Sequence, residues 1–254
     1  MEHMRLMIAA LLCCLCLGLP LAGHCQNEAP PTQDYEMIDL SDGNTLYVVG
    51  YAHLDTQWRW SYQETIRDYL RDTLRDNFAL FEKYPEYIFN FSGSRRYEMM
   101  KEYFPEDYER MKQYVASGNW FPCGSSVDEC DVNVPSCESL IRQVLYGNRY
   151  FRDEFGKTSQ EFILPDCFGF PANMPGVLSH CGIRGFSTQK LTWGSAVGIP
   201  FNVGVWEGLD GSSVVLAAFN PGAYVGRVDQ DLSNSQDWLV MLPALCWVSS
   251  RSPL

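Results

Sequence analysis

The sequence lacks the short motifs that bind nucleotides or activate a serine nucleophile. It contains no G-x-G-x-x-G after a predicted strand, no Walker phosphate loop and no G-x-S-x-G elbow. Histidine is scarce, with four in 254 residues, and only His53 and His180 lie beyond residue 25. Because these motifs are missing, a barrel or partial barrel is favoured over a nucleotide-binding fold.

Basic residues are also in the minority. The 19 Lys and Arg residues are outnumbered by 31 Asp and Glu, which gives a formal net charge of −12. Nucleic acids and anionic membrane surfaces attract basic proteins and repel acidic ones. We therefore expect neither nucleic acid nor a membrane surface as a partner.

The first 25 residues read as a secretory signal peptide. Arg5 precedes a run of almost wholly apolar residues, 6–21, and two small residues follow before a polar stretch. This pattern predicts cleavage between Gly23 and Gln26 and an exported protein, periplasmic or extracellular. A membrane anchor is the alternative, but the apolar run is short for a span.

The cysteines beyond the signal peptide form no C-x-x-C pair, which argues against a zinc finger. An exported protein can form disulfides, and Cys123 with Cys130 or Cys137 is the first pairing to test. Buried free thiols are the equal alternative. The six cysteines concerned are Cys123, Cys130, Cys137, Cys167, Cys181 and Cys246.

Helical and extended segments alternate along the chain. The clearest helix begins at a Ser61–Glu64 capping box and should end near Pro85. Such alternation favours one α/β domain, 40–254, with a mainly parallel sheet or partial β/α barrel. Further helices are predicted over 96–103, 105–116, 136–155 and 173–181, strands over 46–50, 87–91, 120–122, 161–164 and 186–191, and a hairpin from 203–206 and 214–219.

His53 and Asp55 follow the first predicted strand and Asp166 follows the fourth. Parallel sheets keep their chemistry beyond the carboxyl ends of the strands. Imidazole and carboxylate groups one residue apart suit zinc. A loop-capping Asp beside a half-buried His is the alternative interpretation of the first pair.

Four motifs together resemble glycoside hydrolase family 38, and specifically the N-terminal part of a bacterial-type α-mannosidase catalytic domain. They follow the order seen in that family, from about Leu46 to Gly226. The motifs are His53-Leu54-Asp55-Thr56-Gln57-Trp58, Asp166-Cys167-Phe168-Gly169, Gln189-Lys190 and Trp206-Glu207-Gly208-Leu209-Asp210-Gly211.

The resemblance implies a retaining, zinc-dependent α-mannosidase that acts on mannose-containing glycans. By this resemblance, His53, Asp55 and Asp166 bind Zn²⁺, and Asp166 is also the nucleophile. In the same way, the substrate-binding residues are Trp58, Phe168 and Lys190. The zinc would orient the 2- and 3-hydroxyls of the sugar and keep the nucleophile ionised.

The sequence departs from the family pattern at its end. Relatives supply the general acid and a last zinc-binding histidine from a later region, whereas this chain stops at Leu254. We therefore expect an incomplete copy without meaningful turnover. The carboxylates of Asp128, Glu129, Asp131 and Glu207 do not match the family's acid position. A glycan-binding fragment without activity and a metal-dependent carbohydrate deacetylase are the alternative functions.

Overall fold

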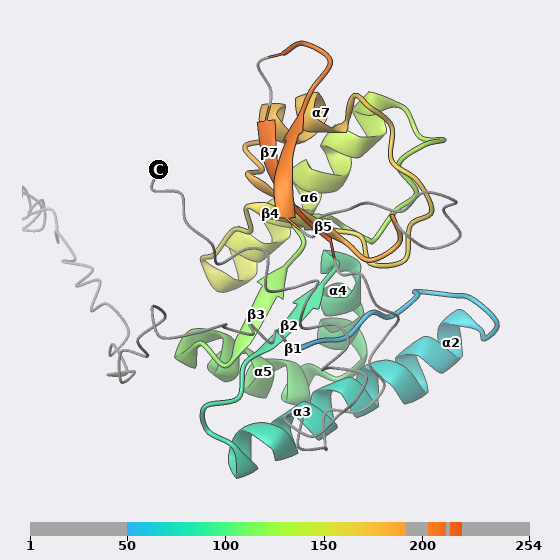
Figure 1. Ribbon diagram of the computed structural model, residues 1–254. Helices are drawn as coiled ribbons and strands as arrows, with labels where there is room; N and C mark the ends of the chain where they lie inside the picture. Colours follow the sequence, from blue (N-terminus) through green and yellow to red (C-terminus); the bar gives the residue numbers. More distant parts are fainter. Residues whose placement is uncertain (1–49, 192–202, 212–213, 220–254) are drawn as a thin grey trace, which may run out of the picture. The chain divides into compact units, whose positions relative to one another are not determined.

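The computed structural model describes residues 50–191, 203–211 and 214–219, all within the unit Leu40–Leu254 (Figure 1). The predicted signal peptide, the strand residues before Gly50 and Cys246 lie outside the described residues. Among the described helices, none has the length and apolar character needed to cross a membrane. The helical elements are α2 (Tyr62–Glu64), η1 (Thr65–Leu70), α3 (Arg71–Lys83), α4 (Ser94–Tyr103), α5 (Pro105–Ser117), α6 (Cys137–Phe155) and α7 (Met174–His180).

The strands form two sheets, and all but one of the strand pairs are parallel. The first sheet has the order β1-β2-β3 and the second β4-β5-β7-β6. Only β6 and β7 pair antiparallel, which confirms the predicted hairpin. The described fold is therefore the predicted α/β arrangement. The strands are β1 (Gly50–Tyr51), β2 (Phe89–Ser92), β3 (Trp120–Cys123), β4 (Glu161–Ile163), β5 (Gly185–Thr188), β6 (Val203–Glu207) and β7 (Val214–Phe219).

A side chain, rather than a backbone ladder, links the exit of β3 to β4. Gly124 and Ser125 both have left-handed backbone conformations, with φ of 80° and 61°. The Ser125 hydroxyl then donates to the carbonyl of Glu161 at 2.7 Å and lies 2.9 Å from the Ser159 hydroxyl. This sharp turn also directs the following loop, residues 124–135, back over the strand ends.

The first long helix begins as the sequence predicts. Ser61 accepts a hydrogen bond from the backbone N–H of Glu64, and the Glu64 carboxylate accepts one from the Ser61 N–H at 2.7 Å. The helix ends at Lys83, and its C-cap Tyr84 precedes a proline. Its middle section, η1, is a π-helix. The spacing of the apolar residues in the sequence does not predict this segment. Short π-helical segments are often found at functional sites. The Thr65 hydroxyl at its start donates to the carbonyl of Thr56 at 2.8 Å.

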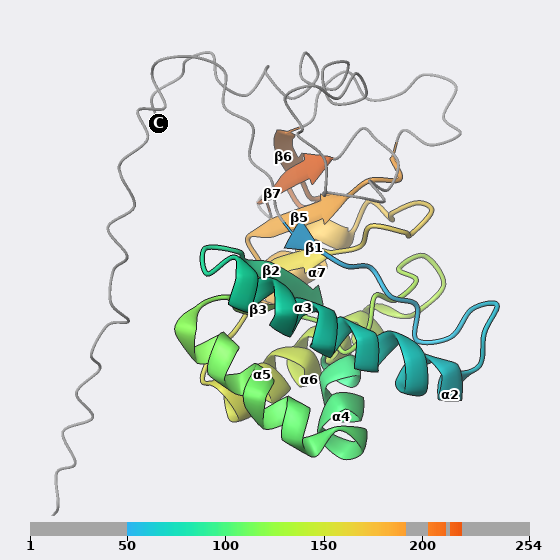
Figure 2. The same cartoon turned by 90° about the horizontal axis from the view of Figure 1, so that it is seen from below.

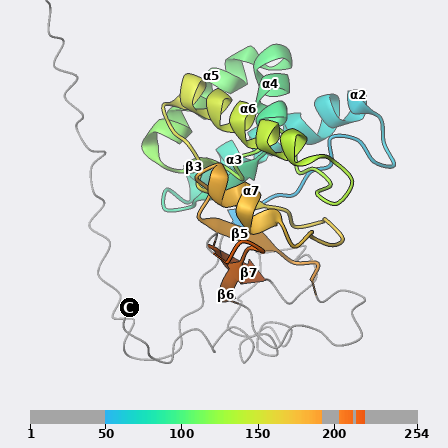
Figure 3. The same cartoon turned by 90° about the horizontal axis from the view of Figure 1, so that it is seen from above.

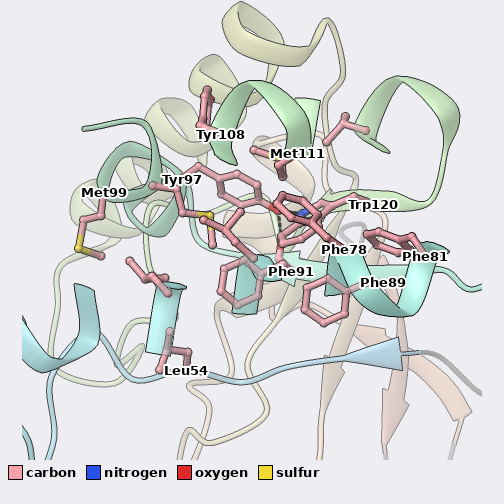
Figure 4. Packing of buried hydrophobic residues seen from close by; sticks show 14 of the residues in the cluster. Leu54, Phe78, Phe81, Phe89, Phe91, Tyr97, Met99, Tyr108, Met111 and Trp120 are labelled. Carbon is pink, nitrogen blue, oxygen red and sulfur yellow. Dashed lines mark hydrogen bonds between the residues drawn. The ribbon is translucent and has the colours of Figure 1, made fainter. Parts of the chain in front are cut away.

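One aromatic core fills the space between the first sheet and helices α3, α4, α5 and α6, which lie on the same side of its strands (Figures 2 and 3). Trp120 is at its centre, and its indole N–H donates to the hydroxyl of Tyr97 at 2.9 Å. That hydroxyl donates in turn to the carbonyl of Phe91. Both polar groups are therefore satisfied inside an otherwise apolar core (Figure 4).

Helix α6 connects this core to a second one. Its Phe151 belongs to the aromatic core, whereas Leu140 and Val144, nearer its start, pack with α7 and the second sheet. The helix therefore contributes apolar side chains to both cores. Its Asn148 side chain donates to the carbonyl of Ser159 at 3.0 Å.

The described cysteines are all free thiols, so the suggested disulfide of Cys123 with Cys130 or Cys137 is absent from this part of the chain. Cys123 is buried at the end of β3, whereas Cys137 is exposed at the start of α6. Burial raises the pKa of the Cys123 thiol well above its usual value. The alternative of buried free thiols therefore holds for Cys123, whereas Cys130, Cys167 and Cys181 are only partly buried and Cys137 is exposed.

Gly147→Ala is expected to lower the free energy of unfolding by about 1–3 kcal/mol. A Cβ at this position of α6 would lie 2.4 Å from the carbonyl carbon of Ser126 and 2.5 Å from the carbonyl oxygen of Ser125. Both are backbone atoms of the turn after β3, so neither can rotate away. Urea denaturation measures the loss.

Gly176→Ala in α7 is the matched control, because no atom lies within 4 Å of its Cβ position. Replacing a helical glycine by alanine at an open position should stabilise the protein by about 0.5–1 kcal/mol. Equal effects of the two substitutions would show that the turn after β3 does not press against α6.

Candidate active site

Polar side chains gather at the carboxyl ends of the parallel strands. His53 and Asp55 follow β1, Glu129 lies in the loop after β3, Asp166 follows β4 and Lys190 follows β5. This is the edge where parallel sheets carry their functional groups. Residues far apart in the sequence therefore meet in one place.

His53 lies at the centre of the group. Its Nε2 atom is 3.2 Å from Asp55 Oδ1 and 3.8 Å from Asp166 Oδ2. Its Nδ1 atom contacts the Glu129 carboxylate from the opposite side of the ring. Burial alone would lower the pKa of His53, but the hydrogen bond and charge of Glu129, together with the charge of Asp55, raise it.

The Asp166 carboxylate is held between His53 and Lys190. The ammonium of Lys190 lies 2.8 Å from Asp166 Oδ1 and 5.4 Å from the centre of the Phe168 ring. Phe168 and Trp58 have relative exposures of 65% and 61%. Aromatic rings of this kind commonly line sites that bind small molecules.

The buried side chain of Arg96 connects the loops that surround the site. It is 1% exposed, and its Nε donates to the carbonyl of Leu54 at 2.8 Å. Its guanidinium also donates to the carbonyl of Ser92 at 3.1 Å and pairs with Asp128 at 3.0 Å. The Asp128 carboxylate in turn accepts from the Thr56 hydroxyl at 2.6 Å. The loops after β1, β2 and β3 are thus joined through one cation.

Glu129 is a functional candidate that the sequence pattern did not assign to the site. Its side chain is 3% exposed and accepts hydrogen bonds from His53, Tyr51 and Ser92. Burial alone would raise the pKa of Glu129, but the hydrogen bond from His53 and the charge of Arg96 keep it below its usual range. The one available signal was its place in a polar loop after a predicted strand.

The same loop also contacts the turn that carries Asp166. The Cys167 thiol donates to the carbonyl of Cys130 at 3.2 Å, and the Asn133 side chain donates to the carbonyl of Gly169 at 2.8 Å. Gly169 has a φ of 114°, a conformation that favours glycine. The loop after β3 therefore contacts both the His53 segment and the Asp166 turn.

The side chains of His53, Asp55 and Asp166 are of types that bind zinc, and the distances between their ligand atoms are close to those found around one zinc ion. Two ligands of one tetrahedral zinc, each about 2.0–2.2 Å from the ion, lie about 3.4 Å apart. The separation of His53 from Asp55 is close to this value, and that of His53 from Asp166 is somewhat larger. Within the described ranges, no three His, Cys, Asp or Glu side chains form a ready-made metal site.

His180, the other histidine beyond residue 25, takes no part in the group. It lies in the last turn of α7 and is exposed. Its exposure to solvent excludes a packing role for this side chain in the core. His180 is the last residue of α7, and Cys181 is the C-cap.

Fold and site together define an α/β enzyme domain whose functional groups lie beyond the carboxyl ends of parallel strands. Comparison with known proteins identifies it further: residues 43–240 match the glycosyl hydrolases family 38 N-terminal domain. The chain therefore belongs to glycoside hydrolase family 38.

Relatives agree with this assignment. Alpha-mannosidase G of Dictyostelium discoideum is 40% identical over 197 residues, which cover 76% of this chain and 18% of the relative. Human alpha-mannosidase 2C1 is 40% identical over 183 residues, or 72% of this chain and 17% of the relative. The chain thus spans less than a fifth of the length of these relatives.

A solved structure has the same fold. An alpha-mannosidase from Enterococcus faecalis aligns with a TM-score of 0.60 and 22% identity, covering 70% of this chain and 20% of that one. At this identity the similarity concerns the fold alone. It agrees with the predicted α/β class.

Proposed function

We propose that the protein is a retaining, zinc-dependent α-mannosidase that hydrolyses terminal α-mannosides of glycans. Membership of family 38 and the mannosidase names of the relatives support the reaction. The observation that carries the proposal is the position of Asp166, whose carboxylate lies between the Lys190 ammonium and the His53 ring.

Asp166 would act as the nucleophile. A retaining glycosidase needs a carboxylate that attacks the sugar and forms a covalent glycosyl-enzyme, and a second carboxyl group roughly 5 Å away as acid and then base. Lys190 holds one oxygen of Asp166, so the other is directed toward His53 and the open side of the site. The carboxylates of Asp55 and Glu129 both contact His53, and we assign neither as the acid.

Trp58 and Phe168 would form the walls of the sugar site. Both rings are largely exposed, and they lie in the loops that follow strands β1 and β4. Trp58 is held by the Arg59 guanidinium, 4.4 Å from its ring centre, and by an edge contact with Trp60. A ring fixed in this way can receive a sugar without losing further conformational freedom.

Zinc would be held by the Nε2 atom of His53 and by the carboxylates of Asp55 and Asp166. When bound, it would supply a Lewis acid that orients the 2- and 3-hydroxyls of mannose. The residues of this chain contribute the rest: Glu129 fixes the imidazole, Lys190 fixes the nucleophile, and the exposed rings exclude water from the sugar face.

Extended to the length of its relatives, the protein should release mannose from nitrophenyl α-mannoside, with the α-anomer as the first product in NMR spectra, whereas the 254-residue chain alone is expected to show no meaningful turnover. Treatment with a chelator should remove this activity, and added Zn²⁺ should restore it. An acetylated sugar offered in parallel should release no acetate. Acetate release without mannose release would instead indicate a deacetylase, and binding of mannosides with neither product would indicate a glycan-binding protein.

A further inference from the structure

We propose that Glu129 is a positioning residue that fixes the orientation and tautomer of the His53 ring. Its carboxylate receives the Nδ1–H of His53, so that the Nε2 lone pair faces Asp55 and Asp166. The part of this inference that concerns metal binding rests on the proposed function. The part that concerns the ring itself does not.

The tautomer follows from the chemistry of the two partners. An ionised carboxylate can only accept hydrogen bonds, so the ring nitrogen that faces Glu129 must carry the proton. In a neutral imidazole the other nitrogen is then an acceptor. That nitrogen, Nε2, is the one that lies 3.2 Å from Asp55 and 3.8 Å from Asp166. Glu129 therefore determines what His53 offers to the site.

The Glu129 carboxylate is itself held in one orientation. Its Oε1 atom accepts from the hydroxyls of Tyr51 and Ser92, which lie 2.8 Å from each other. A terminal nitrogen of Arg96 lies 4.0 Å from the same oxygen. Only Oε2 remains for His53. A carboxylate that is fixed on one oxygen and buried cannot rotate away from the ring.

The backbone around Glu129 is fixed as well. The N–H of Val127 donates to the backbone carbonyl of Gln143 in α6 at 3.1 Å. The N–H of Asp128 donates to the side-chain oxygen of Gln143 at 3.0 Å. The loop is thereby attached to a helix that belongs to both cores. It holds Glu129 at a set distance from the segment that follows β1.

Glu129→Gln is the variant that tests this role, because glutamine keeps the size of the side chain and removes its charge. The amide can place either a donor or an acceptor against Nδ1, so the single tautomer is no longer imposed. Groups that orient a metal-binding histidine typically contribute 10–100-fold to metal affinity. We expect a loss of that size in the Zn²⁺ affinity of the variant, measured by competition with a chromophoric chelator.

Asp128→Asn is the matched control. It removes a negative charge from the neighbouring residue of the same loop, whose carboxylate contacts Arg96 and Thr56 and accepts a hydrogen bond from the backbone N–H of Glu129. A loss caused by charge or by loosening of the loop should appear in both variants. A loss caused by misorientation of the ring should be larger in Glu129→Gln.

The second measurement uses the metal-free protein. Long-range ¹H–¹⁵N spectra distinguish a protonated ring nitrogen from an acceptor nitrogen, and the His53 signals are assigned by their absence in His53→Asn. Spectra are recorded at a pH at which the ring is neutral. The wild-type ring should carry its proton on Nδ1, and the Glu129→Gln ring should show a mixture of tautomers.

A wild-type ring protonated on Nε2 would overturn the inference, and so would a Glu129→Gln variant that binds zinc as tightly as Asp128→Asn. If the wild-type protein binds no zinc, the proposed function fails. The tautomer spectra then decide alone, and an unchanged tautomer in Glu129→Gln would overturn the positioning role.

Discussion

In the protein extended to the length of its relatives, Asp166→Asn is expected to lower kcat for α-mannoside hydrolysis by roughly 10⁴–10⁶-fold, the size of loss seen when a hydrolase loses its nucleophile. The substitution keeps the shape of the side chain but removes the charge that attacks the sugar. It also removes the partner of Lys190, 2.8 Å away. Steady-state assays with nitrophenyl α-mannoside and saturating Zn²⁺ measure the effect.

Asp68→Asn is the control for this experiment. Asp68 is an exposed carboxylate in η1 that pairs with its neighbour Arg67, and exposed pairs of this kind contribute little to stability. Its substitution should leave turnover unchanged. If Asp166→Asn retained activity within tenfold of the wild type while folding normally, a different group would have to attack the sugar.

Arg96→Met should lower the free energy of unfolding by about 3–5 kcal/mol, as expected when one partner of a buried ionic network is removed. The guanidinium balances the charges of Asp128 and Glu129 and satisfies the carbonyls of Leu54 and Ser92. Methionine fills much of the space but offers no donor. Urea denaturation followed by tryptophan fluorescence measures the loss.

The adjacent residue provides a close control. Arg95 is exposed and pairs with Glu98, a surface contact three residues away on the same helix. Arg95→Met should therefore change the free energy of unfolding by less than about 1 kcal/mol. Similar small effects of the two substitutions would mean that water, rather than Arg96, balances the charges of Asp128 and Glu129.

The elements with local signals were predictable from the sequence. The capping box at Ser61, the proline after Tyr84 and the glycine after Phe155 set helix boundaries through contacts within a few residues. The apolar runs before His53 and Asp166 indicated strands, and hence the edge at which these two residues meet. The family motifs supplied the expected roles.

The contacts that hold the site residues in place could not be predicted from local sequence patterns. Arg96 resembles any helical arginine in sequence, and its burial depends on carbonyl groups and carboxylates up to 42 residues away. The partners of Glu129 are separated from it by 37 to 78 residues. Contacts over such distances leave no local period, so only the fold reveals them.

The most direct test of the proposed function is to identify the carboxylate that becomes glycosylated. A fluorinated mannosyl fluoride, which forms the covalent intermediate faster than it is hydrolysed, is incubated with the protein, and the peptides are then mapped by mass spectrometry. We expect one added fluoromannosyl group, on Asp166. A label on another carboxylate, or turnover through an inverted product without any adduct, would contradict the assignment of Asp166 as the nucleophile.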